Sequence, residues 1–426
     1  MSDQITSSTF YNPRKVSHPS KSRFVFASGI ECSYPTVVDA NGRQVRRDQM
    51  AECDHYNRWR EDFELSLQIG CRHLRYGPPY YKIHLGPDQY DWSFTDEVLP
   101  AMREMGITPI LDLCHFGVPD WIGNFQNADW PRYFAEYARA FSLRYPWIRL
   151  FTPVNEMYIT AEFSGYYGWW NERLASHQGF VGALKNVTRA SLEAMLAILE
   201  SRPDALFIHA ESSEHTHANH PDLASEAELF NERRFLTLDL ICGRRISAGM
   251  YAYLRENGMT EAEYAQFRSV DLVEHFVLGH DYYVTNEHLL VAPEIRRAAG
   301  EVFGYAPVAL AYHERYRLPV MHTETNLVDR GGDEAAAWLW KTWANIQMLR
   351  RIGVPICGMT WYSVTDQIDW DVALREKNGT INALGLYDLD RSMRSVGRSY
   401  QKLIAQWADT PLLPYGPLSI VGGLEN

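Results

Sequence analysis

The sequence lacks the targeting and membrane features of several protein classes. Its first residues, MSDQITSSTFYNPRKV, contain no apolar segment of the kind found in secretory signals. No run approaches the ~18 consecutive apolar residues that a membrane-spanning helix needs. The six cysteines form no CxxC pair, which favours reduced core thiols over disulfides or metal ligands. We therefore expect a cytoplasmic protein, in which the sequons at Asn186 and Asn378 are chance matches.

Common cofactor and metal motifs are also missing. The chain has no phosphate-binding glycine loop, no HExxH and no GxSxG. Three histidines, His215, His217 and His220, cluster in the segment HTHANH, but their spacing fits no standard metal-binding helix. We interpret this segment as a solvated loop, and we expect neither a metal nor a cofactor.

The charge of the chain is acidic, with 41 basic and 53 acidic side chains and a formal net charge of −12. Nucleic acids and anionic membranes would be repelled, so we expect neither as a partner. Aromatic residues are abundant, with 13 Trp and 25 Tyr. Most of them belong in a core, but a pocket that stacks flat ligand faces would also use them. The oligomeric state is left open, and a homo-oligomer is one alternative.

Short apolar runs alternate with amphipathic helical stretches along the whole chain. The helical stretches have apolar residues at i, i+3 and i+4 spacing, and the clearest are 57–69, 94–105, 130–144, 187–201 and 335–352. The apolar runs are Phe24–Gly29, Cys71–Tyr76, Thr108–Cys114, Leu150–Val154, Ala205–Ala210, His275–Tyr283, Leu318–His322 and Val354–Thr360. Eight such alternations predict an α/β fold, a single (β/α)₈ barrel over residues 1–426, with an N-terminal arm at 1–20 and a C-terminal tail at 411–426. A doubly wound open sheet is the alternative.

Polar residues follow the predicted strands at corresponding positions. In a barrel, the chemistry lies at the carboxyl ends of the strands, so these side chains would converge on one mouth. Buried carboxylates that converge repel one another and lose hydration, which is a signature of functional sites. The residues at these ends are Glu31, Arg75, His115, Asn155, Glu156, Glu211, Asp281, Tyr283, Glu324, Asp369 and Trp370.

Two glutamates stand out among these residues. Glu156 follows Asn155 just past the fourth predicted strand, and Glu324 follows the seventh. On one barrel both would point into the mouth from opposite sides. A pair of carboxylates in this arrangement is the apparatus of glycoside hydrolysis, where one group protonates the leaving oxygen and the other attacks the anomeric carbon or activates water.

These residues carry a family resemblance. The segment TPVNE, ending at Glu156, resembles the Thr-x-Asn-Glu-Pro acid/base motif of the retaining β-glycosidases of glycoside hydrolase family 1, with Met157 where proline is usual. The segment LPVMHTE, ending at Glu324, resembles that family's nucleophile strand, with Thr325 and Asn326 in place of Asn-Gly. Further matches occur in the family's order: HY at 55–56, RWRED at 58–62, Arg75 in LRYG, His115 in CHFGVP, and SVTDQIDW at 363–370.

The resemblance implies a role for each matched residue. Glu156 would be the acid/base and Glu324 the nucleophile. Arg75 would lower the pKa of Glu324, and Tyr283 would donate a hydrogen bond to it. Glu156, close to that charge and partly enclosed, would have a raised pKa and stay protonated. Asn155 would bind the sugar 2-hydroxyl.

The sugar-binding residues depart from the family's pattern. His115, Asn155 and Trp370 are kept, whereas Pro35 stands at the position of a Gln, and Glu31 is expected to reach the same space. Asp369 replaces a glutamate and Asp281 replaces the Asn of Asn-Tyr-Tyr. The chemistry is thus expected with an altered glycone pocket, whose other candidate residues are Tyr362 (in place of a Trp), Trp121 and Glu211.

Three functions are compatible with these residues. A retaining β-glycosidase acting on a glycoside substrate is favoured, since mere binding needs neither an acid nor a nucleophile. A transglycosidase would use the same site with another acceptor, and a non-catalytic carbohydrate-binding barrel is the third alternative. Extra carboxylates at the mouth suggest a hydroxyl-rich or cationic sugar, and Asp369 argues against a 6-phospho sugar.

Overall fold

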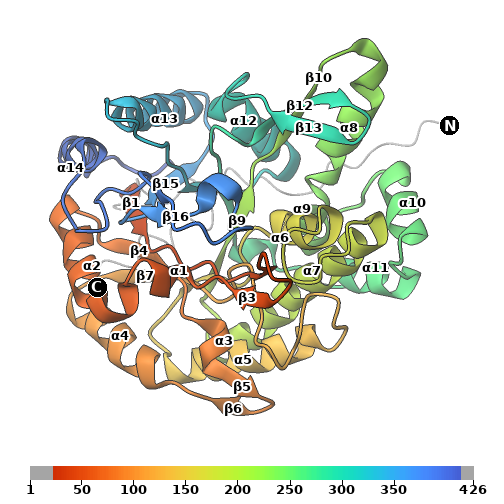
Figure 1. Cartoon of the computed structure of the whole chain (residues 1–426), viewed down its shortest axis with the longest axis horizontal. Coiled ribbons are helices and arrows are strands. Elements are labelled where there is room, and N and C mark those ends of the chain that lie inside the picture. Colours follow the sequence, from red (N-terminus) through yellow and green to blue (C-terminus); the bar gives the residue numbers. More distant parts are fainter. Residues whose placement is uncertain (1–22, 414–426) are drawn as a thin grey trace, which may run out of the picture.

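The computed structural model describes residues 23–413 and contains a closed barrel of eight parallel strands (Figure 1). In spatial order the strands are β1, β15, β14, β11, β9, β8, β7 and β4. Their bounds are β1 Val25–Gly29, β4 His73–Tyr76, β7 Thr108–Asp112, β8 Leu150–Thr152, β9 Leu206–Ser212, β11 Phe276–Asp281, β14 Val320–Glu324 and β15 Ile356–Tyr362. Each predicted run overlaps one strand, although β9, β14 and β15 extend two residues beyond their runs, so the barrel is confirmed and the open sheet is wrong. The predicted arm lies outside the described residues, and the predicted tail is described only through residue 413.

Helices cover the outside of the barrel (Figure 1). The longest, α7, runs over His177–Ser201 and starts ten residues before the predicted stretch. Its start is fixed by the Ser176 side chain, which accepts a hydrogen bond from the backbone N–H of Gly179 and so satisfies an orphan donor. The other helices are α1 Gln49–Glu52, α2 His55–Ile69, α3 Tyr80–Ile83, α4 Ser93–Glu104, α5 Trp130–Arg144, α6 Met157–Ala161, α8 Ala224–Arg233, α9 Leu236–Ile241, α10 Ala248–Glu256, α11 Glu261–Arg268, α12 Tyr305–Tyr316, α13 Glu334–Arg351 and α14 Ser395–Trp407. Within residues 23–413, none of the helices combines the length and apolar content that crossing a bilayer requires.

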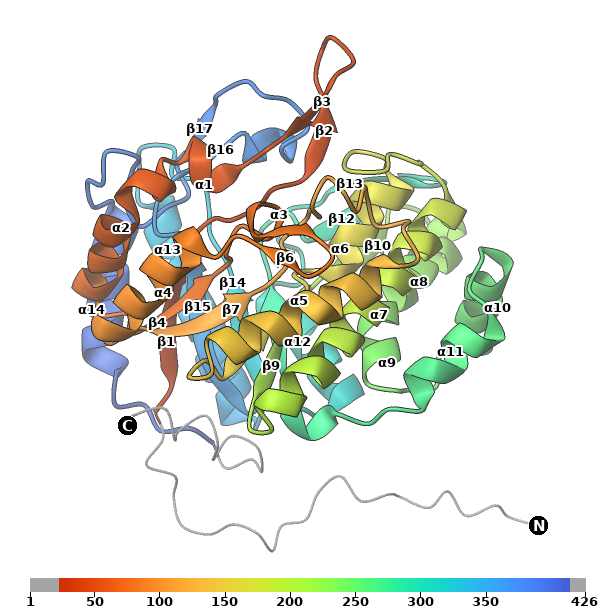
Figure 2. The same cartoon turned by 90° about the horizontal axis from the view of Figure 1, so that it is seen from below.

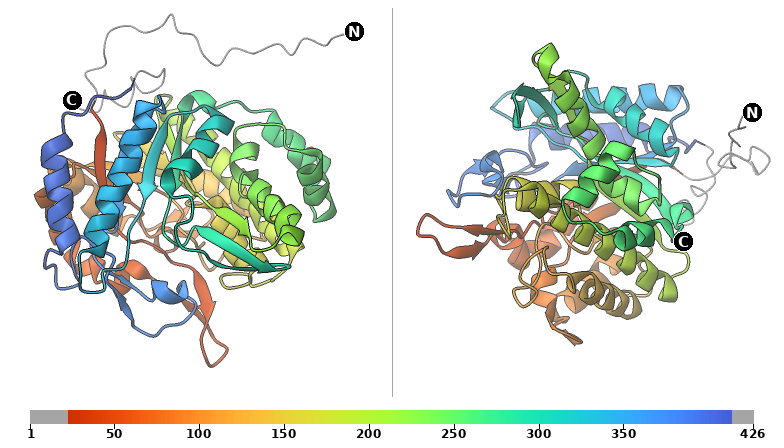
Figure 3. Two further views of the ribbon diagram at one scale, coloured as in Figure 1. Left: turned by 90° about the horizontal axis from the view of Figure 1, so that it is seen from above. Right: turned by 90° about the vertical axis from the view of Figure 1, so that its right-hand side faces the viewer.

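Small two-stranded sheets lie at the end of the barrel where the strands have their carboxyl ends (Figures 2 and 3). The hairpin of β2 (Thr36–Val38) and β3 (Gln44–Arg46) projects there, beside β16 (Gln367–Ile368) and β17 (Ile381–Asn382). A second hairpin, β5 (His84–Gly86) with β6 (Gln89–Tyr90), follows α3.

The HTHANH segment is a correction to the sequence interpretation. His215 and His217 lie on strand β10 (His215–Ala218), which pairs with β12 (Glu287–Ala292) and, through it, with β13 (Ile295–Ala298). Both imidazole rings pack against Phe303, and His217 pairs with Glu287 at 2.7 Å. Hence only His220, which is exposed, fits the predicted solvated loop.

The lower half of the barrel interior is a packed core. Every strand contributes to a layer around a void of only about 10 Å³, lined by Val25, His73, Ile110, Leu150, Leu206, Ile208, Val277, Met321 and Cys357. That volume is at the lower limit for one water molecule. The six cysteines are free thiols, as predicted. The closed bottom leaves the carboxyl ends of the strands as the open end of the barrel.

Candidate active site

Three buried carboxylates meet at the carboxyl ends of the strands. Glu324 is the last residue of β14 and lies opposite Asp281, the last residue of β11, in the strand register. Glu156 follows β8, and its backbone N–H donates to the carbonyl of Ala210 on β9 at 2.9 Å. A carboxylate oxygen from each of Glu156, Asp281 and Glu324 lies within 4.8 Å of the other two. The predicted pair is thus brought together, with a third carboxylate beside it.

Glu324 is held on both of its oxygens. Arg75 forms an ion pair with Oε1, and the phenol of Tyr283 donates to Oε2 at 2.6 Å. The Arg75 side chain is fully buried, so its charge is poorly screened by water. These contacts fix the orientation of the carboxylate and favour its ionised form.

A hydrogen-bonded chain sets the protonation of His115. Arg75, which can only donate, contacts the amide oxygen of Asn155, so the Asn155 NH₂ group faces His115 Nε2 at 3.1 Å. Nε2 must therefore accept, and the ring proton lies on Nδ1, which donates to Asp112 Oδ2 at 2.6 Å. Asp112 also accepts from Arg75 at 2.9 Å. His115 is consequently a neutral imidazole locked in one tautomer.

Glu156 lies in a different electrostatic environment. Burial raises its pKa well above the ordinary value, and the charges of Asp281, Glu211 and Glu214 raise it further, whereas Arg75 opposes them. A carboxyl group in this position holds its proton at neutral pH. At neutral pH Glu156 is therefore a protonated acid, whereas Glu324 is an ionised carboxylate.

Glu211 lies behind Glu156. It accepts hydrogen bonds from the backbone N–H of Tyr158, in the first turn of α6, at 3.1 Å and from the Thr237 hydroxyl at 2.7 Å. Burial raises its pKa to about 8. These contacts make Glu211 a support for the segment after Glu156, in addition to its electrostatic effect.

Glu31 occupies the β1 side of the site. One oxygen accepts from the backbone N–H of Ser33 at 2.8 Å, and the other accepts from Nε2 of Gln367 at 2.9 Å. Burial raises the pKa of Glu31, although Ser33 and Trp370 act in the opposite direction. The half-buried indole of Trp370 packs against Phe116 with ring centroids 6.2 Å apart. Glu31, Gln367 and Trp370 therefore form one side of the site.

Asp369 is already engaged by protein groups. Its Oδ2 pairs with Arg47 at 2.8 Å and accepts the backbone N–H groups of Asn378 and Gly379, while Oδ1 accepts that of Thr380 at 2.7 Å. These bonds outweigh burial and lower its pKa. The carboxylate thus organises the loop after β16.

Tyr362 forms an aromatic wall beside His115. The two rings are parallel within 6° with centroids 6.1 Å apart, and the phenol donates to the carbonyl of Ile30 at 3.0 Å. The Tyr362 ring can take this position because residue 29 is a glycine. A Cβ on residue 29 would lie 2.2 Å from the ring.

Trp121 is placed differently from the other candidates. Its indole donates to the carbonyl of His84 at 2.7 Å, and its ring packs on Tyr133. These contacts tie it to the β5–β6 hairpin and to α5.

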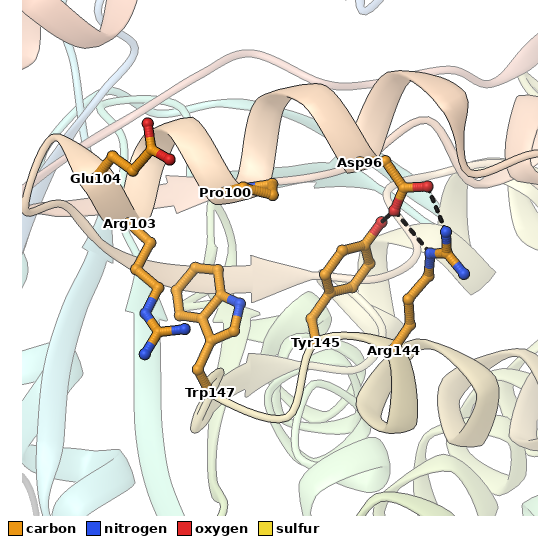
Figure 4. A pocket seen from close by; sticks show the side chains of 7 residues that line it. All are labelled: Asp96, Pro100, Arg103, Glu104, Arg144, Tyr145 and Trp147. Atoms are coloured by element: carbon orange, nitrogen blue, oxygen red, sulfur yellow. Dashed lines mark hydrogen bonds and ion pairs between the residues drawn. The ribbon is translucent and has the colours of Figure 1, made fainter.

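A large surface hollow of about 820 Å³ lies on the outer wall, between α4 and the end of α5 (Figure 4). Asp96 pairs there with Arg144, and Trp147 lies beside Arg103. Its lining comes from the outer helices and the segment before β8, so it is separate from the carboxylates.

Several site residues were not found from the sequence. Asp112 orients Arg75 and His115, Arg47 binds Asp369, and Gln367 binds Glu31. Asp112 had a usable signal, since it lies three residues before His115 at the end of an apolar run. Gln367 lies within the matched segment at 363–370, but its partner Glu31, like the Asp369 partner of Arg47, is more than 300 positions away.

Two groups of buried side chains have a spacing that a metal ion could use: Glu156 with Asp281 and Glu324, and Cys32 with Asp112 and His115. Arg75 forms ion pairs with a carboxylate of each group, Glu324 and Asp112. Burial also raises the pKa of the Cys32 thiol well above its usual range. A guanidinium thus already supplies positive charge to both groups.

Comparison with known proteins gives a family. Residues 34–285 match the model of glycosyl hydrolase family 1, a range that contains Arg75, His115, Glu156 and Tyr283. Among curated proteins, a 1,4-beta-D-glucan glucohydrolase of Thermotoga neapolitana is 30% identical over 128 residues, covering 27% of this chain and 29% of that protein. Beta-glucosidase A of Thermotoga maritima is 27% identical over 166 residues, covering 36% of each chain. The chain therefore aligns with about a third of the length of these relatives.

The fold is shared over a greater length. The structure of a beta-glucosidase from Thermotoga maritima in complex with deoxynojirimycin superimposes with a TM-score of 0.73 at 17% identity, covering 90% of this chain and 97% of that chain. This likeness extends over the strands that carry Glu324 and Tyr362, which lie beyond the matched range of the family model.

Proposed function

Because this chain belongs to glycosyl hydrolase family 1, we propose that it is a retaining β-glycosidase that hydrolyses O-glycosidic bonds through a covalent glycosyl-enzyme intermediate. The observation that carries the proposal is the pairing of Glu156 with Glu324. One carboxylate oxygen of Glu156 lies within 4.8 Å of one of Glu324, and this close approach supports the short ~5–5.5 Å separation of carboxyl groups in retaining enzymes.

In the first step, Glu324 attacks the anomeric carbon and Glu156 gives its proton to the departing oxygen. Arg75 and Tyr283 hold Glu324 in one orientation before attack, so little reorganisation is needed. The raised pKa of Glu156 keeps its proton available at neutral pH.

In the second step, Glu156 takes a proton from water, and the water attacks the anomeric carbon and displaces the Glu324 carboxylate. Esterification removes the negative charge of Glu324, so the pKa of Glu156 falls and its carboxylate becomes a base. Water restores the free sugar and the ionised nucleophile, with retention after two inversions.

The glycone pocket is proposed to differ from that of the usual β-glucosidase. Asp369, at the family's glutamate position, is saturated by Arg47 and backbone N–H groups and has little capacity left for sugar hydroxyls. Glu31, backed by Gln367 and Trp370, offers the buried carboxylate instead. A site rebuilt around other hydrogen-bonding groups selects other hydroxyl patterns.

The test is labelling with a panel of 2-deoxy-2-fluoro glycosides that carry activated leaving groups. We expect mass spectrometry to find one sugar attached to Glu324, and the reactive glycone would identify the preferred sugar. Glu324→Gly should abolish hydrolysis, and Glu156→Ala should stall the second step on activated substrates, with rescue by azide as a β-glycosyl azide.

Controls separate the alternatives. Glu301→Gln, on the surface loop before α12, should retain full activity. Wild-type rates in either catalytic variant would contradict the assignment. Products attached to an added acceptor sugar, in place of free sugar, would indicate a transglycosidase. Sugar binding without labelling or turnover would indicate a carbohydrate-binding barrel.

A further inference from the structure

We infer that Asp281 is a positioning residue for the catalytic proton: its carboxylate keeps Glu156 protonated to higher pH than an amide in the same place would, and so moves the working pH range upward. The inference rests on the proposed function of Glu156. It concerns a residue where the family's usual Asn-Tyr-Tyr pattern has an amide, which carries no charge.

The position of Asp281 places its charge beside both catalytic groups. It ends β11 in register with Glu324 on β14 and Ser212 on β9. One of its oxygens lies within 4.8 Å of an oxygen of Glu156 and of one of Glu324. Its side chain is fully buried, so no bulk water screens the interaction.

The charge of Asp281 is not neutralised locally. Neither of its oxygens has a hydrogen-bond partner in acceptable geometry among the described residues, and no ion pair there reaches it. Arg75 directs its Nη atoms to Glu324, Asp112 and Asn155. Arg75 therefore attracts Asp281 over a longer distance than it attracts Glu324, with which it forms a direct ion pair.

Groups of both signs face this pair of carboxyls. Burial raises the pKa of Asp281 to about 6, with Arg75 and the Thr323 hydroxyl opposing and Asp112 adding to the rise. Glu211 also faces Asp281, and the groups that face Glu156 are Asp281, Glu324, Glu211, Glu214, Arg75 and Tyr283. Among the acidic groups that raise the pKa of Glu156, Asp281 contributes most.

The proton therefore has a preferred location. Above about pH 6 Asp281 is ionised and Glu156 holds the shared proton. Two carboxyl groups this close do not both ionise readily, so ionised Asp281 resists the loss of the proton from Glu156. Below that pH Asp281 is itself protonated and its effect disappears.

The same charge acts in the second step. When Glu324 is esterified its charge is lost, but that of Asp281 remains beside Glu156. The carboxylate of Glu156 is consequently a stronger base toward water than it would be beside an amide. Both steps thus gain from Asp281 at neutral and mildly alkaline pH.

The experiment is the pH dependence of kcat/KM for Asp281→Asn against the wild type, on an aryl glycoside whose leaving group needs protonation. We expect the alkaline limb of the profile to move to lower pH by about one unit in the variant. The acidic limb should move little, because Asp281 is protonated below about pH 6 and then carries no charge that acts on Glu324. With a 2,4-dinitrophenyl leaving group, which needs no proton, the alkaline limb of the first step should be weak in both proteins.

Matched variants make the result decisive. Asp281→Ser, another neutral residue, should give the same shift if Asp281→Asn folds poorly. Asp239→Asn removes a buried carboxylate that pairs with Arg315 on the outer helices, and it should leave both limbs unchanged. An alkaline limb that stays within 0.2 pH units, about the precision of such profiles, in both Asp281 variants would overturn the inference. If the wild type has no glycosidase activity and Glu324 is not labelled, the proposed function fails instead.

Discussion

Arg47 Nη2 lies 2.8 Å from Asp369 Oδ2, and neither side chain is exposed to solvent. The pair joins the segment after β3 to the loop after β16, which are more than 300 positions apart. Arg47 also binds Glu52 and the carbonyls of Leu374 and Glu376. Asp369 is therefore the centre of a loop anchor at the mouth.

Replacing Asp369 should primarily destabilise the protein. Asp369→Asn leaves a buried guanidinium with less compensating charge, and we expect a loss of about 3 kcal/mol in the free energy of unfolding at pH 7. The lowered pKa of Asp369 means that this contribution is present above its ordinary value of 3.8 and is lost as the pH falls below it. Urea unfolding measures the loss. The exposed neighbour provides a control, since Asp371→Asn should change little; equal stability of both variants would contradict the anchor.

The phenol of Tyr283 should contribute to catalysis through Glu324. Tyr283→Phe removes a hydrogen bond to a charged group, worth about 1.5–3 kcal/mol, so kcat/KM should fall about ten- to a hundredfold. The adjacent Tyr282 offers a matched control, because its phenol binds Glu287 at 2.7 Å. Tyr282→Phe should weaken stability and leave kcat/KM within about twofold. Similar kinetic losses in both variants would indicate a general packing effect.

Asp112 should control the His115 tautomer. Asp112→Asn weakens its bonds to Arg75 and His115 Nδ1, and we expect kcat/KM to fall about ten- to a hundredfold, mainly through misplacement of Asn155 and Arg75. The ¹⁵N chemical shifts of the His115 ring should report loss of the Nδ1–H form.

The chain contains a second His–Asp–Arg arrangement that serves as the control. Asp62 and His55, both on α2, are 2.8 Å apart, and Asp62 also contacts Arg391 at 2.9 Å. Asp62→Asn should reduce stability and leave the pH profile of kcat/KM as in the wild type. An unchanged His115 tautomer in Asp112→Asn would refute the role assigned to Asp112.

Each deeply buried histidine should make the folded barrel less stable in acid, opposite in sign to buried carboxyl groups with raised pKa values such as Glu211 and Asp281. Burial lowers the pKa of six histidines to between about 3 and 4: the deeply buried His73, His209, His280 and His322, and the less enclosed His84 and His215. Below their ordinary value of 6.5 the unfolded chain binds protons that the folded chain does not. Stability should fall as the pH drops from 6.5 toward 4, by up to about 1.4 kcal/mol per pH unit for each histidine.

Urea unfolding at pH 7.5 and 5.5 measures this slope. His209 packs edge-on against Phe276, so His209→Phe keeps a flat ring and removes one titrating group. Between pH 7.5 and 5.5 the variant should lose about 1.4 kcal/mol less in total than the wild type, because a histidine of the unfolded chain is half protonated at pH 6.5. His220→Gln, an exposed position, should leave the slope unchanged. A wild-type slope in His209→Phe would show that the ring is protonated in the folded state.

The barrel was predictable because its strands are buried on both faces. Such strands are continuous apolar runs, and the residues that follow them, including Glu156 and Glu324, lie at the mouth by topology alone. The prediction of a solvated loop for the HTHANH segment was wrong for the opposite reason. Its polar residues form a strand, because pairing with β12 and packing on Phe303 supply an environment that lies 70 or more positions away.

The interaction partners of the site residues could not be predicted from the sequence. The motif at 363–370 identified Asp369 as a sugar ligand candidate, but its hydrogen-bonding capacity depends on Arg47, which lies in an unremarkable polar loop. Likewise, the bond from Gln367 to Glu31 requires the barrel to close. Long-range pairing of polar groups depends on atomic distances, and local hydrophobic patterns carry no information about them.

The contact between Gly29 and Tyr362 has a consequence for biosynthesis. β1 emerges first from the ribosome and β15 last, and their pairing closes the barrel, with the Tyr362 ring against Gly29 and its phenol on Ile30. The wall of the site is therefore completed only when the final strand has been translated. A nascent chain that already contains Glu156 and Glu324 still lacks that wall. The site and the closed barrel are therefore completed together.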